Sequence, residues 1–183
     1  CANRKLGAAV TQQMYFAIPG DLNARTGGYG YDRRLLVELR KRGLLVEHIK
    51  LDGSFPFPGA NALQQTERVF AELPDQSLVL VDGLAFGAMA QCAMRHAQRL
   101  RLVALCHHPL ALESGLSPIQ QESLLASERI ALQCASAIIV TSAHTAHTLT
   151  ELFAISSSDI TVAQPGTDSV NFAPCAGEPP ILL

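Results

Sequence analysis

Short apolar runs alternate with segments of helical period along this chain, and no other feature constrains the fold as strongly. Six runs have the length and composition of strands, at residues 14–18, 45–51, 78–81, 102–106, 137–140 and 160–163. Most of them lack polar alternation, which is typical of strands that are covered on both faces. The alternation therefore predicts a doubly wound α/β fold with a mostly parallel, Rossmann-like sheet.

The segment after the first strand carries the clearest helix signal. We expect Asp32 to cap this helix at its start and Gly43 to end it. Leu35, Leu36 and Leu39 recur at helical spacing, so they are expected to form the stripe that faces the sheet.

A capping-box pattern predicts a later helix. Ser117 is followed by Pro118 and Gln120, which suits the start of a helix running to about residue 135. Further helices are expected at residues 61–73, 84–99 and 142–153.

The length of 183 residues suits one domain, since domains average roughly 150 residues. We expect a leader or tag-like segment at residues 1–13 and a Rossmann-like domain at residues 14–166. Residues 167–183 are rich in proline and glycine and end in an apolar Ile-Leu-Leu sequence. We interpret them as a linker and the start of a second domain that is missing from this chain.

Charge and cysteine content exclude several classes of protein. The 14 basic and 16 acidic residues give a net charge of −2, so no global positive field attracts nucleic acid or an anionic membrane. No apolar run approaches the roughly 20 residues of a transmembrane helix. The cysteines form an odd set without Cys-x-x-Cys spacing, at positions 1, 92, 106, 134 and 175. We interpret them as reduced, mostly buried thiols in a cytoplasmic protein.

Ligands of parallel sheets bind beyond the carboxyl ends of the strands, so the loops there are the candidate sites. In the first of these loops Gly27, Gly28 and Gly30 precede a helix, whose free N–H groups and dipole favour a phosphate. A flexible turn is the plain alternative. The glycines lie too far from the strand for a dinucleotide fingerprint, although Asp52 stands where a ribose-binding acid would be. Binding of a nicotinamide cofactor therefore stays open as an alternative.

The sequence CHHPLALESG, residues 106–115, is the most specific local feature. Imidazole transfers protons near neutral pH, and adjacent histidines point in different directions, so one of them is expected to face a site. We favour His108, with His107 packing or bonding to backbone. Metal ligation is one alternative, and two hydrogen-bonded histidines in a polar loop are another.

Asp82 ends an apolar strand and precedes Gly83, which places its carboxylate at the same sheet edge as the histidines. It could hold a substrate hydroxyl or cap the following helix, and the residues alone do not decide between these roles.

Three stretches together resemble the amino-terminal half of a GT-B glycosyltransferase of family 4. They are TGGYGYDRRLLVEL (26–39), HHPLALESGL (107–116), and the segment 127–174, which contains a Thr-Ser turn and a Pro-Gly-x-Asp linker. Thr167 replaces the more usual valine of that linker. The resemblance implies transfer of a sugar from a nucleotide-sugar donor to an acceptor with retained anomeric configuration, generally without a metal.

The resemblance also implies roles for single residues. His108 would be the catalytic histidine near the sugar, and Gly27 and Gly28 would approach the donor's phosphates. The acceptor pocket would be formed by Asp82, His107 and Glu113. The implied partners are a nucleotide-sugar donor, an unidentified acceptor and a carboxy-terminal donor-binding domain, with no resident cofactor. Without that domain we expect little or no turnover. A nucleotide-binding module and a non-enzymatic interaction domain remain the alternatives.

Overall fold

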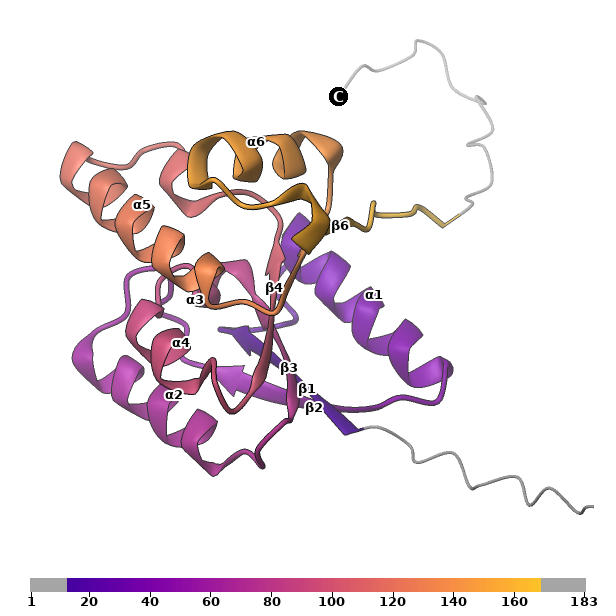
Figure 1. Cartoon of the computed structure of the whole chain (residues 1–183). Coiled ribbons are helices and arrows are strands. Elements are labelled where there is room, and N and C mark those ends of the chain that lie inside the picture. The colour runs from indigo at the N-terminus through magenta and orange to yellow at the C-terminus, as the bar shows by residue number, and fades with distance from the viewer. Residues whose placement is uncertain (1–12, 169–183) are drawn as a thin grey trace, which may run out of the picture.

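A computed structural model describes residues 13–168 and shows one parallel sheet of six strands (Figure 1). The strands lie in the order β2-β1-β3-β4-β5-β6, and every neighbouring pair is parallel. Their bounds are β1 Gln13–Pro19, β2 Leu45–Leu51, β3 Leu78–Asp82, β4 Arg101–Cys106, β5 Ala137–Val140 and β6 Ile160–Val162. The predicted α/β fold with a Rossmann-like parallel sheet is confirmed.

A helix connects each strand to the next along the chain, except that two short helices, α3 and α4, link the central strands β3 and β4. The helices are α1 Gly27–Lys41, α2 Ala60–Glu72, α3 Gly83–Phe86, α4 Ala90–His96, α5 Pro118–Gln133 and α6 Ala143–Phe153, with 3-10 turns η1 Leu110–Leu112 and η2 Ser157–Asp159. The capping box of α5 is formed as predicted, because Ser117 accepts from the Gln120 amide and the Gln120 side chain accepts from Ser117.

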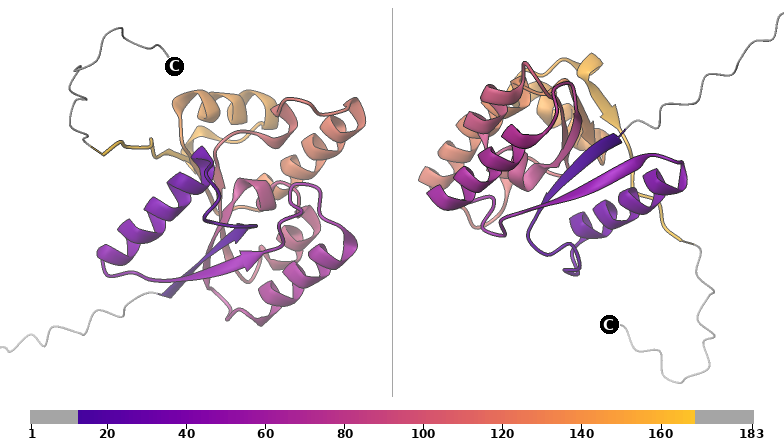
Figure 2. Two further views of the ribbon diagram at one scale, coloured as in Figure 1. Left: turned by 180° about the vertical axis from the view of Figure 1, so that it is seen from behind. Right: turned by 90° about the horizontal axis from the view of Figure 1, so that it is seen from below.

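The sheet separates two apolar layers, and β1 shows how the sequence builds both. Met14, Phe16 and Ile18 face α1, whereas the alternating residues Tyr15 and Ala17 join the larger core with the other helices. Period-2 alternation therefore decides which face each side chain covers, although both faces are apolar. Figures 1 and 2 show α1 alone on one side of the sheet, with α2, α4 and α5 on the other.

Two helix predictions are wrong in detail. Thr26, not Asp32, caps α1, since its hydroxyl accepts from the Tyr29 amide, while Asp32 lies inside the helix and is buried. The predicted helix at 84–99 is two helices, α3 and α4, separated by residues 87–89. Gly83 explains where the first of them begins. A Cβ at this position would lie 2.9 Å from the Leu105 carbonyl oxygen of β4, so the close approach requires glycine.

The strand order reverses next to β1, because the chain first adds β2 on one side and then β3 on the other. Ligands of open parallel sheets bind at such a switch point, beyond the carboxyl ends of the strands. The first turn of α1 and the ends of β3 and β4 meet there.

The described part of the chain includes no helix that is both long and apolar enough to span a membrane. Cys92, Cys106 and Cys134 are free, as predicted, and the first two are buried. Cys1 and Cys175 lie outside the described residues, as do the predicted leader up to residue 12 and most of the linker.

Candidate functional site

The amino-terminal turn of α1 forms one wall of the candidate site. Thr26 caps the helix, and Gly27 and Gly28 are its first two residues. A Cβ at Gly27 would meet nothing within 4 Å, whereas one at Gly28 would lie 3.6 Å from the His107 ring. Gly27 also lines a hollow of about 390 Å³ between α1 and residues 164–166. The sequence-predicted glycines therefore lie beside a predicted histidine, and one of them opens onto free space.

His107 lies at the centre of the site, between two carboxylates. Its Nε2 is 3.3 Å from Oδ1 of Asp32 and 3.5 Å from Oδ2 of Asp82. The Tyr31 ring packs edge-on against the imidazole, with ring centroids 5.3 Å apart. Both carboxylates are buried, while the His107 side chain keeps 24% of its surface exposed. The imidazole is thus the part of this cluster that reaches solvent.

The two carboxylates keep the imidazole charged. Burial by itself lowers the pKa of His107, but the hydrogen bonds and charges of Asp32 and Asp82 outweigh it and raise the pKa to about 9. Burial raises the pKa of Asp32 to about 6, although the hydrogen bond with His107 lowers it and the charge of Asp82 raises it. At neutral pH the site therefore contains an imidazolium.

Backbone contacts hold His107 in place. Its carbonyl oxygen accepts from the Thr141 hydroxyl at 3.4 Å and from the Thr145 hydroxyl at 3.2 Å. Thr145 lies on α6, whose start is capped by Ser142. The Thr-Ser turn singled out in the sequence therefore positions the first histidine of the CHHPLALESG segment.

The structure gives the two adjacent histidines different surroundings. We favoured His108 facing the site, but the ring next to Asp32, Asp82 and Gly28 belongs to His107, and His108 is exposed. Both residues follow the last residue of β4, Cys106, in the loop before η1, and in this loop only the His107 ring turns toward α1. Glu113 is exposed at the end of η1, on the same loop but without a hydrogen bond to the cluster.

Asp82 fulfils the capping role that the sequence allowed. Its Oδ1 accepts from the Leu84 amide at 2.9 Å at the start of α3, while Oδ2 faces His107. The side chain is 2% exposed. Because the carboxylate is buried next to the imidazole, it influences a bound ligand through His107 and not by direct contact.

Asp32 is the site residue that sequence reasoning missed, since we interpreted it as a helix cap. It is fully buried, and its Oδ2 has no hydrogen-bond partner among the described residues. A helix turn separates Asp32 from Gly28, so both lie on the same face of α1. That spacing from the glycines was the available signal.

Two clusters of described residues have the spacing of a metal site. In Asp32, Asp82 and His107 the ligand atoms lie within 4.8 Å of one another. A protonated imidazole cannot ligate a metal, so a cation there would have to displace the proton that both carboxylates stabilise. The cluster therefore suits a protonated histidine better than a metal ion.

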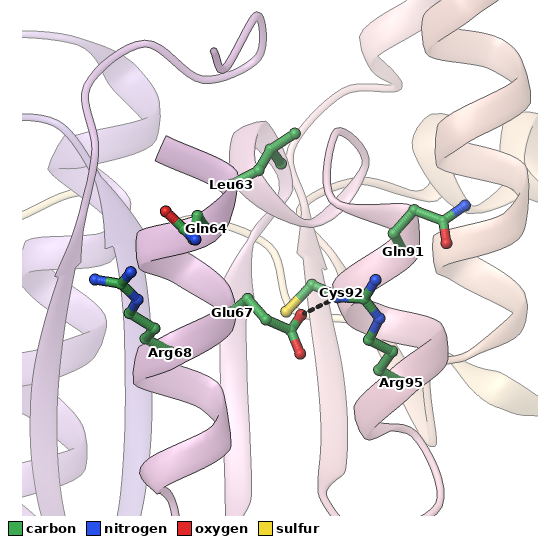
Figure 3. A pocket seen from close by; sticks show the side chains of 7 residues that line it. All are labelled: Leu63, Gln64, Glu67, Arg68, Gln91, Cys92 and Arg95. Atoms are coloured by element: carbon green, nitrogen blue, oxygen red, sulfur yellow. Dashed lines mark ion pairs between the residues drawn. The ribbon is translucent and has the colours of Figure 1, made fainter. Parts of the chain in front are cut away.

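The second cluster lies between α2 and α4 and consists of Glu67, Cys92 and His96, of which Figure 3 draws the first two. It borders a hollow of about 500 Å³, in which Glu67 faces Cys92 and pairs with Arg95. His96 Nδ1 accepts from Arg99, so its Nε2 carries the proton and donates to Glu67. In this tautomer the one lone pair of the ring, on Nδ1, already accepts from Arg99, and burial raises the pKa of the Cys92 thiol. The cluster is a helix-helix contact.

Comparison with known proteins agrees with this architecture. The family model described as Glycosyltransferase Family 4 matches residues 29–170, which include Asp32, Asp82 and His107. A comparison with curated proteins gave no match. The match covers well over half of the chain and the resemblance seen in the sequence is confirmed, so the chain belongs to glycosyltransferase family 4.

Proposed function

We propose that this chain is the acceptor-side half of a retaining glycosyltransferase that uses a nucleotide-sugar donor. The observation that carries the proposal is the position of the His107 ring, whose Nε2 lies 3.3 Å from buried Asp32 and 3.5 Å from buried Asp82 at the switch point of the sheet. Its Nε2 faces the carboxylates, and Nδ1 has no hydrogen-bond partner within residues 13–168. A ligand oxygen can therefore accept a proton or a charged hydrogen bond from Nδ1.

The chemistry of sugar transfer requires such a group. A departing nucleoside diphosphate gains negative charge, and preorganised donors that meet this charge lower the barrier. His107 supplies one positive charge, and the free N–H groups at the start of α1, around Gly27 and Gly28, supply a second favourable field. Both act from the same edge of the sheet.

The remaining roles complete the proposal. Glu113 and His108, which are exposed on the loop after β4, would face the acceptor together with the long first loop. A carboxy-terminal domain would bind the donor and close over this edge. No metal or resident cofactor would take part, because the imidazolium and the helix amides already provide positive charge. The free cysteines Cys92 and Cys106 support a cytoplasmic location.

The test compares the two histidines in the intact protein that contains this chain. Nucleoside diphosphate release from a panel of nucleotide sugars, with candidate acceptors, measures transfer. We expect His107→Ala to lower kcat at least about 100-fold, the range of a lost proton or charge donor in the transition state. His108→Ala, at the exposed neighbour, should retain most of the activity.

Each outcome decides between specific alternatives. A large loss in His108→Ala with an active His107→Ala would return the catalytic role to His108. If neither variant changes the rate, the imidazolium has no part in transfer. Tight binding of NADH with no binding of any nucleotide sugar would instead favour the nucleotide-binding alternative.

A further inference from the structure

A buried carboxylate from another helix holds the loop that carries His107. Glu128 of α5 is 2% exposed, and its Oε2 accepts from the Leu110 amide at 2.9 Å. The neighbouring Ala111 amide also lies on the side of this carboxylate and lowers its pKa. Both amides belong to the start of η1, which has no side-chain cap of its own. Glu128 therefore caps this short turn from outside.

The contact is closely packed on all sides. A Cβ at Gly87 would lie 2.8 Å from Cδ1 of Leu110 and 3.1 Å from Cγ of Glu128. Leu110, Ala111 and Leu124 form a small apolar cluster of their own around it. Because a buried amide without a hydrogen-bond partner destabilises the fold, the position of η1 depends on this carboxylate.

We propose that Glu128 is a positioning residue for the candidate site, and that its negative charge anchors η1 and so sets the loop from His107 to Glu113. Protonation of Glu128 would then loosen the loop and lower activity. The functional part of this inference depends on the proposed sugar transfer, whereas the anchoring of the loop does not.

The negative charge of Glu128 lowers the free energy of unfolding, because the carboxylate is buried. Burial raises its pKa to about 7, although the Leu110 and Ala111 amides lower it, and the charge of Glu113 raises it further. A folded-state pKa above the unfolded one means that the folded protein binds more protons between about pH 4.5 and 7. Ionised Glu128 therefore lowers stability above about pH 7, where a neutral side chain would not.

The other ionisable groups around Glu128 do not neutralise it. Cys106 on β4 has a thiol whose pKa is raised well above its ordinary value by burial, and then by Glu128. Residues 83–89, which pack against α5, include no ionisable side chain. On α4, Arg95 and His96 contact Glu67 instead. On α5 itself the neighbouring charges are Glu122 and Arg129, and both side chains are exposed.

The test measures hydrogen exchange of the loop amides in the intact protein. In Glu128→Gln at pH 8, Leu110 and Ala111 should exchange about 10-fold faster than in the wild type, because a charged hydrogen bond is replaced by a weaker neutral one. Glu122→Gln removes the same charge from the exposed face of α5 and should leave exchange unchanged. The Glu128→Gln protein should melt no earlier than the wild type at pH 8, which separates loop anchoring from overall stability.

Two further measurements test the same idea. The first uses only the wild-type protein, and the second measures activity in place of hydrogen exchange. In the wild type, protection of the same amides, corrected for intrinsic exchange rates, should fall between pH 8 and pH 6 with a midpoint near pH 7. In the wild type, the rate of sugar transfer should fall as the pH drops through about 7, where Glu128 becomes protonated. This fall should be absent from Glu128→Gln, in which only a fall near pH 6, from Asp32, would remain.

Unchanged loop exchange in Glu128→Gln, together with pH-independent protection in the wild type, would overturn the anchor. If the intact protein transfers no sugar, the proposed function fails, and the exchange experiment still decides whether Glu128 anchors the loop. If activity falls in Glu128→Gln only as far as the protein unfolds, Glu128 is a structural residue and not a positioning one.

Discussion

At the scale of single residues, the site depends on two buried carboxylates that raise the pKa of one imidazole. Asp32 and Asp82 both face Nε2 of His107, and neither is exposed enough to be compensated by water. Their charges decide the protonation state of the imidazole, because burial alone would favour its neutral form. The pair of aspartates is therefore the reason that His107 is charged at neutral pH.

The Asp32→Asn variant should show how much one carboxylate contributes to the charge of His107. Removing one carboxylate should lower the pKa of His107 from about 9 by at least about one pH unit, because hydrogen bonding to Asp32 is the largest effect that raises it. NMR titration of the His107 ring measures this directly. Asp52→Asn, at an exposed position where the carboxylate accepts from the Ser54 amide, is the matched control and should leave the pKa of His107 unchanged. An Asp32→Asn protein in which His107 still titrates near pH 9 would assign the shift to Asp82 alone.

At the scale of elements, the ends of β3 and β4 bring α3 and the histidine loop into contact. Asp82 caps α3, and Gly83 lets the helix backbone approach β4 at Leu105. The carbonyl of His107 is in turn held by α6 through Thr145. The site is therefore supported by three elements that follow different strands.

Two glycines test this element packing. Gly83→Ala should lower the free energy of unfolding by about 1–3 kcal/mol, because its Cβ would overlap a strand backbone that cannot move aside. Gly27→Ala adds the same methyl group into open space and should change stability by less than about 0.5 kcal/mol. Denaturant unfolding measures both. If Gly27 approaches a donor phosphate, its variant should also bind nucleotide sugars more weakly, and unchanged affinity would contradict that role.

At the scale of the whole molecule, the doubly wound sheet presents its site on one edge. Helix α1 covers one face and the remaining helices cover the other, so the switch point beside β1 is the place where loops from both sides meet. An edge of this kind leaves one side of a bound ligand uncovered, which suits closure by a second domain.

Metal independence is a prediction at this scale. Since the imidazolium and the α1 amides supply positive charge, EDTA treatment of the intact protein should leave the rate of sugar transfer unchanged. Measuring nucleoside diphosphate release before and after dialysis against EDTA provides the test. A loss of activity that Mg²⁺ or Mn²⁺ restores would show that a metal supplies the charge instead.

The sequence by itself determined the elements and the edge on which the site lies. Strand and helix signals act between residues that are close in the chain, so the six strands and the Ser117–Gln120 capping box could be predicted. Gly27, Gly28, Asp82 and the histidine pair could be placed at one edge because parallel strands end together. The helix at 84–99 was mispredicted, because the break at residues 87–89 depends on the packing of Gly87 against Leu110 and Glu128.

Only the tertiary structure decided which side chains make the site. Asp32 and His107 are 75 residues apart and meet because α1 packs across the sheet from β1 to β4. No spacing rule relates such residues, and an aspartate near a helix start usually signals a cap. The surroundings of His107 depend on how the loop after β4 packs against α1, and the contact of Glu128 depends on how α5 packs against η1. Charge and burial are properties of that assembled environment, so the protonation of these groups was not readable from the chain alone.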